Sequence, residues 1–160
     1  MRNFLKILLI SIAFFSSLSL QAQTDFGVKG GLNFTFFKVD EGDFGERPDA
    51  ELGYYIGCFV DFEIEKNFRL QPELLYISLG DFDFLNAPIY LKYNINDRFN
   101  ILVGPSLNYF FDFFNTKLKV GADLGFAYNL SSSLDLHIKY TLGFDVLSPN
   151  GMFFGMRYKL

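Results

Sequence analysis

The stretch that decides the fold spans residues 134–145 and reads LDLHIKYTLGFD. Its even-numbered residues, from Leu134 to Phe144, are all apolar or aromatic, while its odd-numbered residues, from Asp135 to Asp145, are charged, polar or glycine. Because successive side chains of a β-strand point to opposite faces of a sheet, this alternation predicts a strand with one apolar and one polar face. The fold then depends on how often the pattern recurs and on which face meets water.

The same alternation recurs along the chain after its N-terminal segment. Strands are predicted near residues 25–37, 51–63, 68–79, 84–94, 99–111, 116–129, 134–145 and 151–160. Short turns at 65–67, 96–98 and 131–133 alternate with other connections, which include a long acidic loop at 38–50. This arrangement predicts an all-β fold, an eight-stranded antiparallel up-and-down transmembrane β-barrel with the long loop outside the cell. Pro72, Pro88 and Pro105 lie within predicted strands, so a bulge or a missing ladder bond is expected at each.

The N-terminal segment has the features of a secretory signal peptide. Arg2 and Lys6 give it a positive start, residues 5–15 form an apolar run too short to span a bilayer, and Ala22 ends a stretch of small residues. Residues 1–22 are therefore predicted to be the signal peptide and residues 23–160 the outer-membrane β-barrel domain. Without Arg2 and Lys6 the mature chain keeps 12 of its 14 basic residues against 18 acidic ones, which argues against nucleic acid as a partner.

Two features favour a membrane barrel, whose apolar face meets lipid, over a soluble periplasmic lipocalin-like barrel, whose apolar face forms the core. Glycines gather on the charged face, where they make room for large side chains in a narrow lumen. They are Gly27, Gly31, Gly53, Gly57, Gly104, Gly121, Gly125, Gly143 and Gly155. Aromatic residues of the apolar face gather near both ends of the predicted strands, as expected at two bilayer interfaces. The expected location is the outer membrane of a Gram-negative cell, where the lipid bilayer surrounds a monomeric protein.

Several stretches of the sequence resemble the PorT-like outer-membrane β-barrel proteins, a family of small eight-stranded barrels. The resemblance covers the whole mature chain and rests on FGVKGGLN at 26–33, QPELLY at 71–76, APIYLKY at 87–93, VGP at 103–105 and GMRYKL at 155–160. The closing strand of the family usually ends in an aromatic residue, whereas this chain ends in Leu160. The resemblance implies an eight-stranded barrel and no particular activity, since most members have none assigned.

Charged residues of both signs fall on the inward face and are expected to form a polar network in the lumen. The predicted members are Lys29, Glu73, Lys92, Asp123, His137, Lys139 and Arg157. Because buried charges must be paired, Glu73 and Asp123 are expected to form salt bridges among Lys92, Lys139 and Arg157. An eight-stranded barrel is just wide enough for its own side chains, so the expected protein is a structural or partner-contacting barrel that does not conduct. A narrow pore is the alternative.

Apolar inward residues gather in the outer half of the predicted barrel. They are Leu75, Ile77, Leu79, Phe110 and Phe153, with Phe44 and Phe84 as further members. Such a set either packs into a small hydrophobic plug or forms an apolar pocket for an acyl chain or another hydrophobic small molecule. Both interpretations remain open from the sequence.

Catalytic, cofactor-binding and metal-binding sites are not expected. His137 is the only histidine, and although Asp135 shares its face and Ser78 or Ser106 lies in the lumen, a triad is defined by geometry rather than by its parts. One histidine and the apolar-facing Cys58 are too few for a metal site. The acidic residues of the 38–50 loop lack the spacing of a calcium loop. The sequence therefore predicts a protein that is not an enzyme and binds no cofactor.

Overall fold

A computed structural model describes residues 24–36, 51–80, 83–111, 117–144 and 150–160. The predicted signal peptide, the acidic loop at 38–50 and Phe44 lie outside these residues, so the expectations about them stay predictions. Within the described ranges there is no helix long and apolar enough to cross a membrane.

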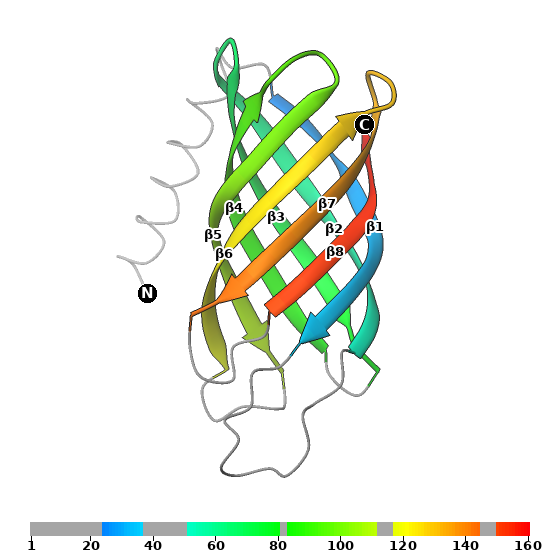
Figure 1. The fold of residues 1–160 in the computed structure, drawn as a ribbon, viewed down its shortest axis with the longest axis vertical. Coiled ribbons are helices and arrows are strands. Elements are labelled where there is room, and N and C mark those ends of the chain that lie inside the picture. Colours follow the sequence, from blue (N-terminus) through cyan, green and yellow to red (C-terminus); the bar gives the residue numbers. More distant parts are fainter. Residues whose placement is uncertain (1–23, 37–50, 81–82, 112–116, 145–149) are drawn as a thin grey trace, which may run out of the picture.

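The described residues form eight antiparallel strands that close into a barrel (Figure 1). The strands are β1 (Thr24–Phe36), β2 (Glu51–Glu65), β3 (Phe68–Ser78), β4 (Asp83–Asn94), β5 (Phe99–Phe110), β6 (Leu118–Asn129), β7 (Leu134–Gly143) and β8 (Asn150–Lys159). Each strand pairs with its neighbours in sequence, and β1 pairs with β8 from Gly27↔Lys159 to Phe36↔Asn150. The predicted fold class is confirmed, and the strand ranges agree with the predicted ones except for small differences at their ends.

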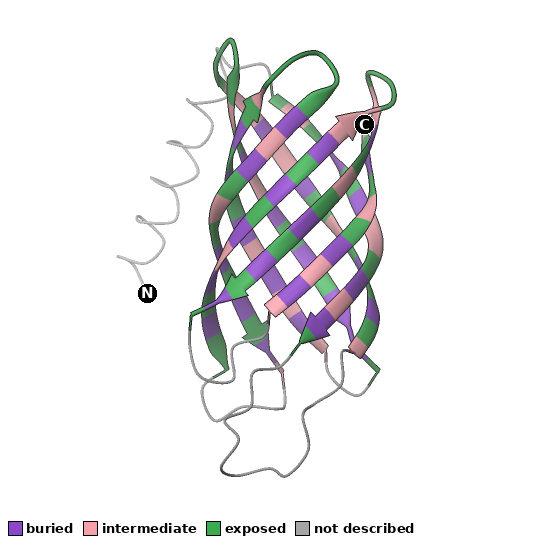
Figure 2. Cartoon of the chain, viewed as in Figure 1, coloured by how far each residue is buried: buried purple, intermediate pink, exposed green. Residues whose placement is uncertain are grey.

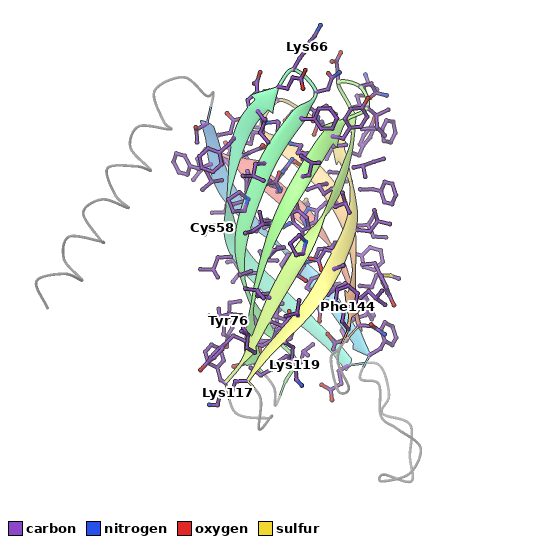
Figure 3. The ribbon with its side chains drawn as sticks, turned by 90° about the vertical axis from the view of Figure 1, so that its left-hand side faces the viewer. Cys58, Lys66, Tyr76, Lys117, Lys119 and Phe144 are labelled. Atoms are coloured by element: carbon purple, nitrogen blue, oxygen red, sulfur yellow. The ribbon has the colours of Figure 1, made fainter. Side chains whose placement is uncertain are left out.

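The two ends of the barrel differ in the way that the sequence predicts. The turns after β2, β4 and β6 are short, and they lie at the same end as the start of β1 and the end of β8 (Figure 1). Lys66 marks this end in Figure 3, while Tyr76, Lys117, Lys119 and Phe144 mark the opposite end. In an outer-membrane barrel the short turns face the periplasm, so the opposite end is called the outer end below.

The apolar face of the strands forms the outside of the barrel. Buried and exposed residues alternate along every strand (Figure 2). Ile56 on the outside is 62% exposed, whereas Tyr90 on the inside is 1% exposed. Cys58 likewise points away from the barrel at mid-height (Figure 3). A continuous apolar belt of this kind needs a cover of lipid or protein. The alternative of a soluble lipocalin-like barrel, whose apolar face would be the core, is therefore wrong.

Aromatic residues of the outside lie near the strand ends, as predicted. Phe68 and Tyr93 pack together at the periplasmic end with their ring centres 5.0 Å apart, and Phe99 and Tyr128 do so at 4.9 Å. Aliphatic side chains such as Val103 occupy most of the exposed positions at mid-strand, and Phe154 in the middle of β8 is an exception. This sorting by height matches the two interfaces of a bilayer.

The three prolines interrupt the hydrogen-bonded ladders without shifting their register. Pro72 has no partner on β2, Pro88 has none on β3 and Pro105 has none on β4, although each pairs with the strand on its other side. The register is the same before and after each gap, because proline removes a donor without adding a residue. Of the two expected outcomes, a missing ladder bond is therefore the one found.

Candidate functional site

The inside of the barrel holds a network of paired charges, and its centre is the ion pair between Lys29 on β1 and Glu73 on β3. The Lys29 Nζ lies 2.8 Å from the Glu73 Oε2, and the two side chains are 4% and 0% exposed. Gln71 also donates to the Glu73 carboxylate at 2.6 Å. Gly57, opposite Lys29 in the β1–β2 ladder, lies against Leu74 and Leu75 without space for a Cβ. This carboxylate is therefore fully enclosed and bonded.

A second buried carboxylate, Asp123 on β6, collects donors from three other strands. The Lys139 Nζ lies 3.2 Å from its Oδ2, the Tyr90 hydroxyl donates to it at 2.6 Å, and the Ser106 hydroxyl donates at 2.7 Å. Lys139 also donates to the side-chain oxygen of Asn86 at 2.8 Å. These bonds tie β4, β5, β6 and β7 together across the lumen.

Arg157 on β8 completes the middle of the network. Its Nε donates to Asp135 on β7 at 2.5 Å, and its Nη1 donates to Gln71. The guanidinium lies over the ring of Phe59, with Cζ 4.9 Å from the ring centre. Phe59 can lie flat there because Gly27, which it covers, has no Cβ.

A third cluster closes the periplasmic end. Asp61 accepts hydrogen bonds from Lys92 at 2.9 Å and from Arg69 at 2.7 Å. Arg69 also reaches Glu63 at 3.1 Å and Asp25 at 2.9 Å. The charges at this end are thus shared among several partners, and the pairs become more exposed toward the mouth of the barrel.

All seven residues of the predicted lumen network lie inside the barrel, but some of their partners differ from those expected. Lys139 pairs with Asp123 as expected. Glu73 pairs instead with Lys29, Lys92 with Asp61, and Arg157 with Asp135. The expectation that Lys92 and Arg157 pair with Glu73 or Asp123 is therefore wrong. Arg157 lies directly opposite Asp135 on the adjacent β7, whereas Lys92 reaches past β3 to Asp61 on β2.

His137 faces the lumen and is bonded to a tyrosine that the sequence analysis did not single out. Its Nε2 lies 2.6 Å from the hydroxyl of Tyr55, and its Nδ1 lies 3.8 Å from Asp135. Tyr55 crosses toward Gly155, where a Cβ would lie 2.2 Å from the tyrosine hydroxyl. Because the Ser106 hydroxyl donates to Asp123, it is not part of a triad with His137. Tyr55 shares the parity of Gly53 and Gly57, and this was the signal in the sequence that could have placed it inside.

The apolar residues predicted for the outer half form one cluster. It consists of Tyr55, Leu75, Ile77, Leu79, Phe84, Phe110 and Phe153, each between 0% and 4% exposed. Phe84 and Phe110 stack with their ring centres 4.6 Å apart, and Tyr55 meets Phe153 edge to face at 5.4 Å. The structure therefore brings together all five residues of the predicted apolar pocket, packed against one another.

Hollows between these side chains are small, and a larger one opens at the periplasmic mouth. One hollow of about 10 Å³ lies among Lys29, Tyr90, His137 and Lys139, and another of about 10 Å³ lies beside Phe153. Each has room for about one water molecule. The mouth holds about 610 Å³ between the three short turns, above Lys92 and Asp135.

No group of three or more histidine, cysteine, aspartate or glutamate residues in the described part of the chain has the arrangement of a metal site. The carboxylates of the lumen are engaged with lysine, arginine, tyrosine and serine donors instead. What this arrangement can do chemically is hold the strands together at a fixed distance.

Comparison with known proteins gives a family and a fold. The family model "Outer membrane protein beta-barrel domain" matches residues 7–157. A de novo designed transmembrane β-barrel is similar in structure with a TM-score of 0.55 and 18% identity, over 87% of this chain and 95% of that one. The attachment invasion locus protein Ail of Yersinia pestis, in complex with the heparin analogue sucrose octasulfate, has a TM-score of 0.55 and 14% identity, over 86% and 99%. No curated protein gives a significant match. The narrower resemblance to PorT-like proteins stays a prediction.

Proposed function

This chain belongs to the outer membrane protein β-barrel domain family, and we propose that it is a structural or partner-contacting member whose lumen is closed by its own side chains. The observation that carries the proposal is the layer of ion pairs across the lumen. Lys29, Glu73, Asp123, Lys139 and Arg157 are each at most 6% exposed, and all have bonded partners. A water-filled channel would instead leave its lining charges hydrated.

The protein acts without catalysis and as a single chain. The β1–β8 pairing closes the barrel within one chain, which supports a monomer in the bilayer. The only histidine is bonded to Tyr55, and the lumen carboxylates are held by ion pairs, which leaves them little freedom to act as acids or bases. Contact with partners falls to the outer end and to the periplasmic mouth.

Single-channel recording in planar bilayers tests the closed lumen. The purified barrel is expected to insert without giving steady conductance steps. A control variant in which Phe59, Tyr90 and Arg157 are all changed to alanine loses three large buried side chains and is expected to conduct. Steady unitary steps from the unmodified protein would overturn the closed lumen and favour the narrow pore.

A second candidate function is binding of a hydrophobic small molecule by the apolar cluster near the outer end. The burial of seven apolar side chains in one place favours it, since apolar lining is typical of ligand sites. Fluorescent fatty acids are the probes: saturable binding that Phe110→Ser abolishes would support this role. Absence of saturable binding would leave the cluster as packing that stiffens the outer half.

A further inference from the structure

Asn108, on β5 near the outer end, carries an amide group that lacks a partner although it is deeply buried. Asn108 is 2% exposed, and its Nδ2 has no hydrogen-bond partner among the described residues. A buried donor without a partner costs free energy, and structures keep few of them. A donor of this kind therefore points to something that binds beside it.

The orientation of this amide follows from a chain of hydrogen bonds that begins at a lysine. Lys139 donates to the Asn86 Oδ1 at 2.8 Å, and the Asn86 Nδ2 donates to the Asn108 Oδ1 at 2.9 Å. An ammonium group only donates, so the bond from Lys139 fixes which end of Asn86 carries the oxygen, and Asn86 in turn fixes Asn108. The free end of Asn108 is therefore an N–H donor, and it requires an acceptor.

Asn108 is one of the residues that line a small hollow just inside the outer rim. The other lining residues are Thr35, Phe84, Thr141, Gly151 and Phe153. All six lie within three residues of the outer ends of their strands. The hollow measures about 10 Å³, so it accepts one small group rather than a chain.

A second buried donor lies on β1, close to Gly151, which is one of the residues that line the hollow. The Asn33 Nδ2 has no partner among the described residues, and its residue is fully buried. A Cβ on Gly151 would lie 3.4 Å from this nitrogen and 2.9 Å from the Phe153 ring, so the missing side chain of Gly151 leaves the hollow open. The case for Asn108 is stronger than that for Asn33. If the amide of Asn33 were turned over, its nitrogen could donate to the Thr35 hydroxyl, which accepts as well as donates.

We propose that this hollow binds one small monovalent anion, a halide such as chloride or bromide. Asn108 donates to the anion, and Asn33, beside Gly151, is the nearest further donor. The Lys139 Nζ lies 4.0 Å from the centre of the Phe153 ring. Lys139 begins the chain of hydrogen bonds through Asn86 to Asn108, and its positive charge polarises both amide groups so that they favour a negative ligand. Phe84 and Phe153 form the apolar sides of the hollow and exclude bulk water.

Side-chain amide signals in ¹H–¹⁵N NMR spectra of the folded, full-length barrel in micelles test the site. Sodium chloride and sodium bromide are titrated at constant ionic strength, with sulfate as an anion too large for the hollow. The expected result is a saturable shift of the Asn108 amide with chloride or bromide and none with sulfate. Asn100 is the matched control, because its Nδ2 already donates to Asn129 at 3.1 Å, and its amide is expected to stay in place.

Two variants separate loss of the site from loss of the fold. Asn108→Asp replaces the free donor by a carboxylate oxygen and still accepts from Asn86, while Gly151→Ala fills the hollow without removing either donor. Each is expected to weaken anion binding by about tenfold or more. Folding is checked by the heat-modifiable mobility of each variant on gels. One folded variant is enough to test the site if the other fails to fold.

The proposal is overturned if no saturable shift appears at Asn108, or if the shift at Asn100 is the same. It is also overturned if the Asn108 amide protons show transfer only to a bound water that chloride and bromide do not displace. Unchanged affinity in a folded Gly151→Ala barrel would likewise place the anion elsewhere.

Discussion

Replacing Lys29 by methionine tests how dry the lumen is. The Lys29–Glu73 pair joins β1 to β3 at 2.8 Å, with side chains that are 4% and 0% exposed. Lys29→Met keeps most of the length of the side chain but leaves the Glu73 carboxylate without its nearest cation. Gln71 still donates to Glu73 at 2.6 Å, so one of its bonds remains.

Removing one partner of a buried ion pair typically costs about 3–5 kcal/mol, which is the expected loss in the free energy of unfolding for Lys29→Met. The double variant with Glu73→Met removes both charges and is expected to recover most of this loss, since an apolar pair of similar volume is often as stable. Lys159→Met is the matched control: its partner is Asp25 at 3.0 Å, the side chains are 28% and 39% exposed, and the expected cost is under about 1 kcal/mol.

Urea unfolding of the barrel in lipid vesicles measures these differences. The chain has no tryptophan, so far-ultraviolet circular dichroism and the gel mobility of the folded form are the suitable signals. If Lys29→Met costs no more than Lys159→Met, the Glu73 carboxylate is hydrated in the folded protein. That result would refute the closed lumen, because water would reach the centre of the barrel.

The remaining predictions concern other parts of the wall and lumen. Gly155→Ala is expected to cost about 1–3 kcal/mol and to break the Tyr55–His137 bond, because the new Cβ would lie 2.2 Å from both the Tyr55 hydroxyl and the Gly30 carbonyl oxygen. Urea unfolding measures the cost, and a neutral effect would contradict the close approach. Backbone amides beside Pro72, Pro88 and Pro105 are expected to exchange with deuterium faster than those of the continuous β6–β7 ladder, since paired neighbours are missing there. NMR in micelles measures the exchange, and uniform protection across β2–β5 would contradict the interrupted ladders.

Much of the barrel wall follows from the sequence because side chains alternate with a period of two. The stretch from Leu134 to Gly143 is a strand in the structure, and its odd-numbered residues Asp135, Lys139 and Thr141 are buried. Parity alone divides each strand into two faces, because a slip by one residue would turn every side chain to the other side. The glycines and the aromatic residues then identify the face that meets lipid.

Contacts across the lumen do not follow from parity, because they depend on the tilt and stagger of the strands as well. Lys29 meets Glu73 although 44 positions separate them, and Arg157 meets Asp135 because β7 and β8 place them opposite each other. Tyr55 shows a second limit. Beside the outward Tyr54 it looks like one more residue of an aromatic girdle, and the glycine that gives its hydroxyl room is Gly155 on β8, which is distant in sequence.

The central claim is that the apolar face of the barrel wall meets lipid while the charged face encloses a closed lumen. The reactivity of thiols on the outside and the inside of the barrel tests it most directly. Cys58 is exposed on the outside, and Ser106 is 1% exposed on the inside. In vesicles, Cys58 is expected to react with a lipid-soluble maleimide and not with a charged one. In a Cys58→Ser, Ser106→Cys variant, the new thiol is expected to react with neither reagent until urea unfolds the barrel. Rapid labelling of that inward thiol by a small charged reagent in the folded protein would contradict the account.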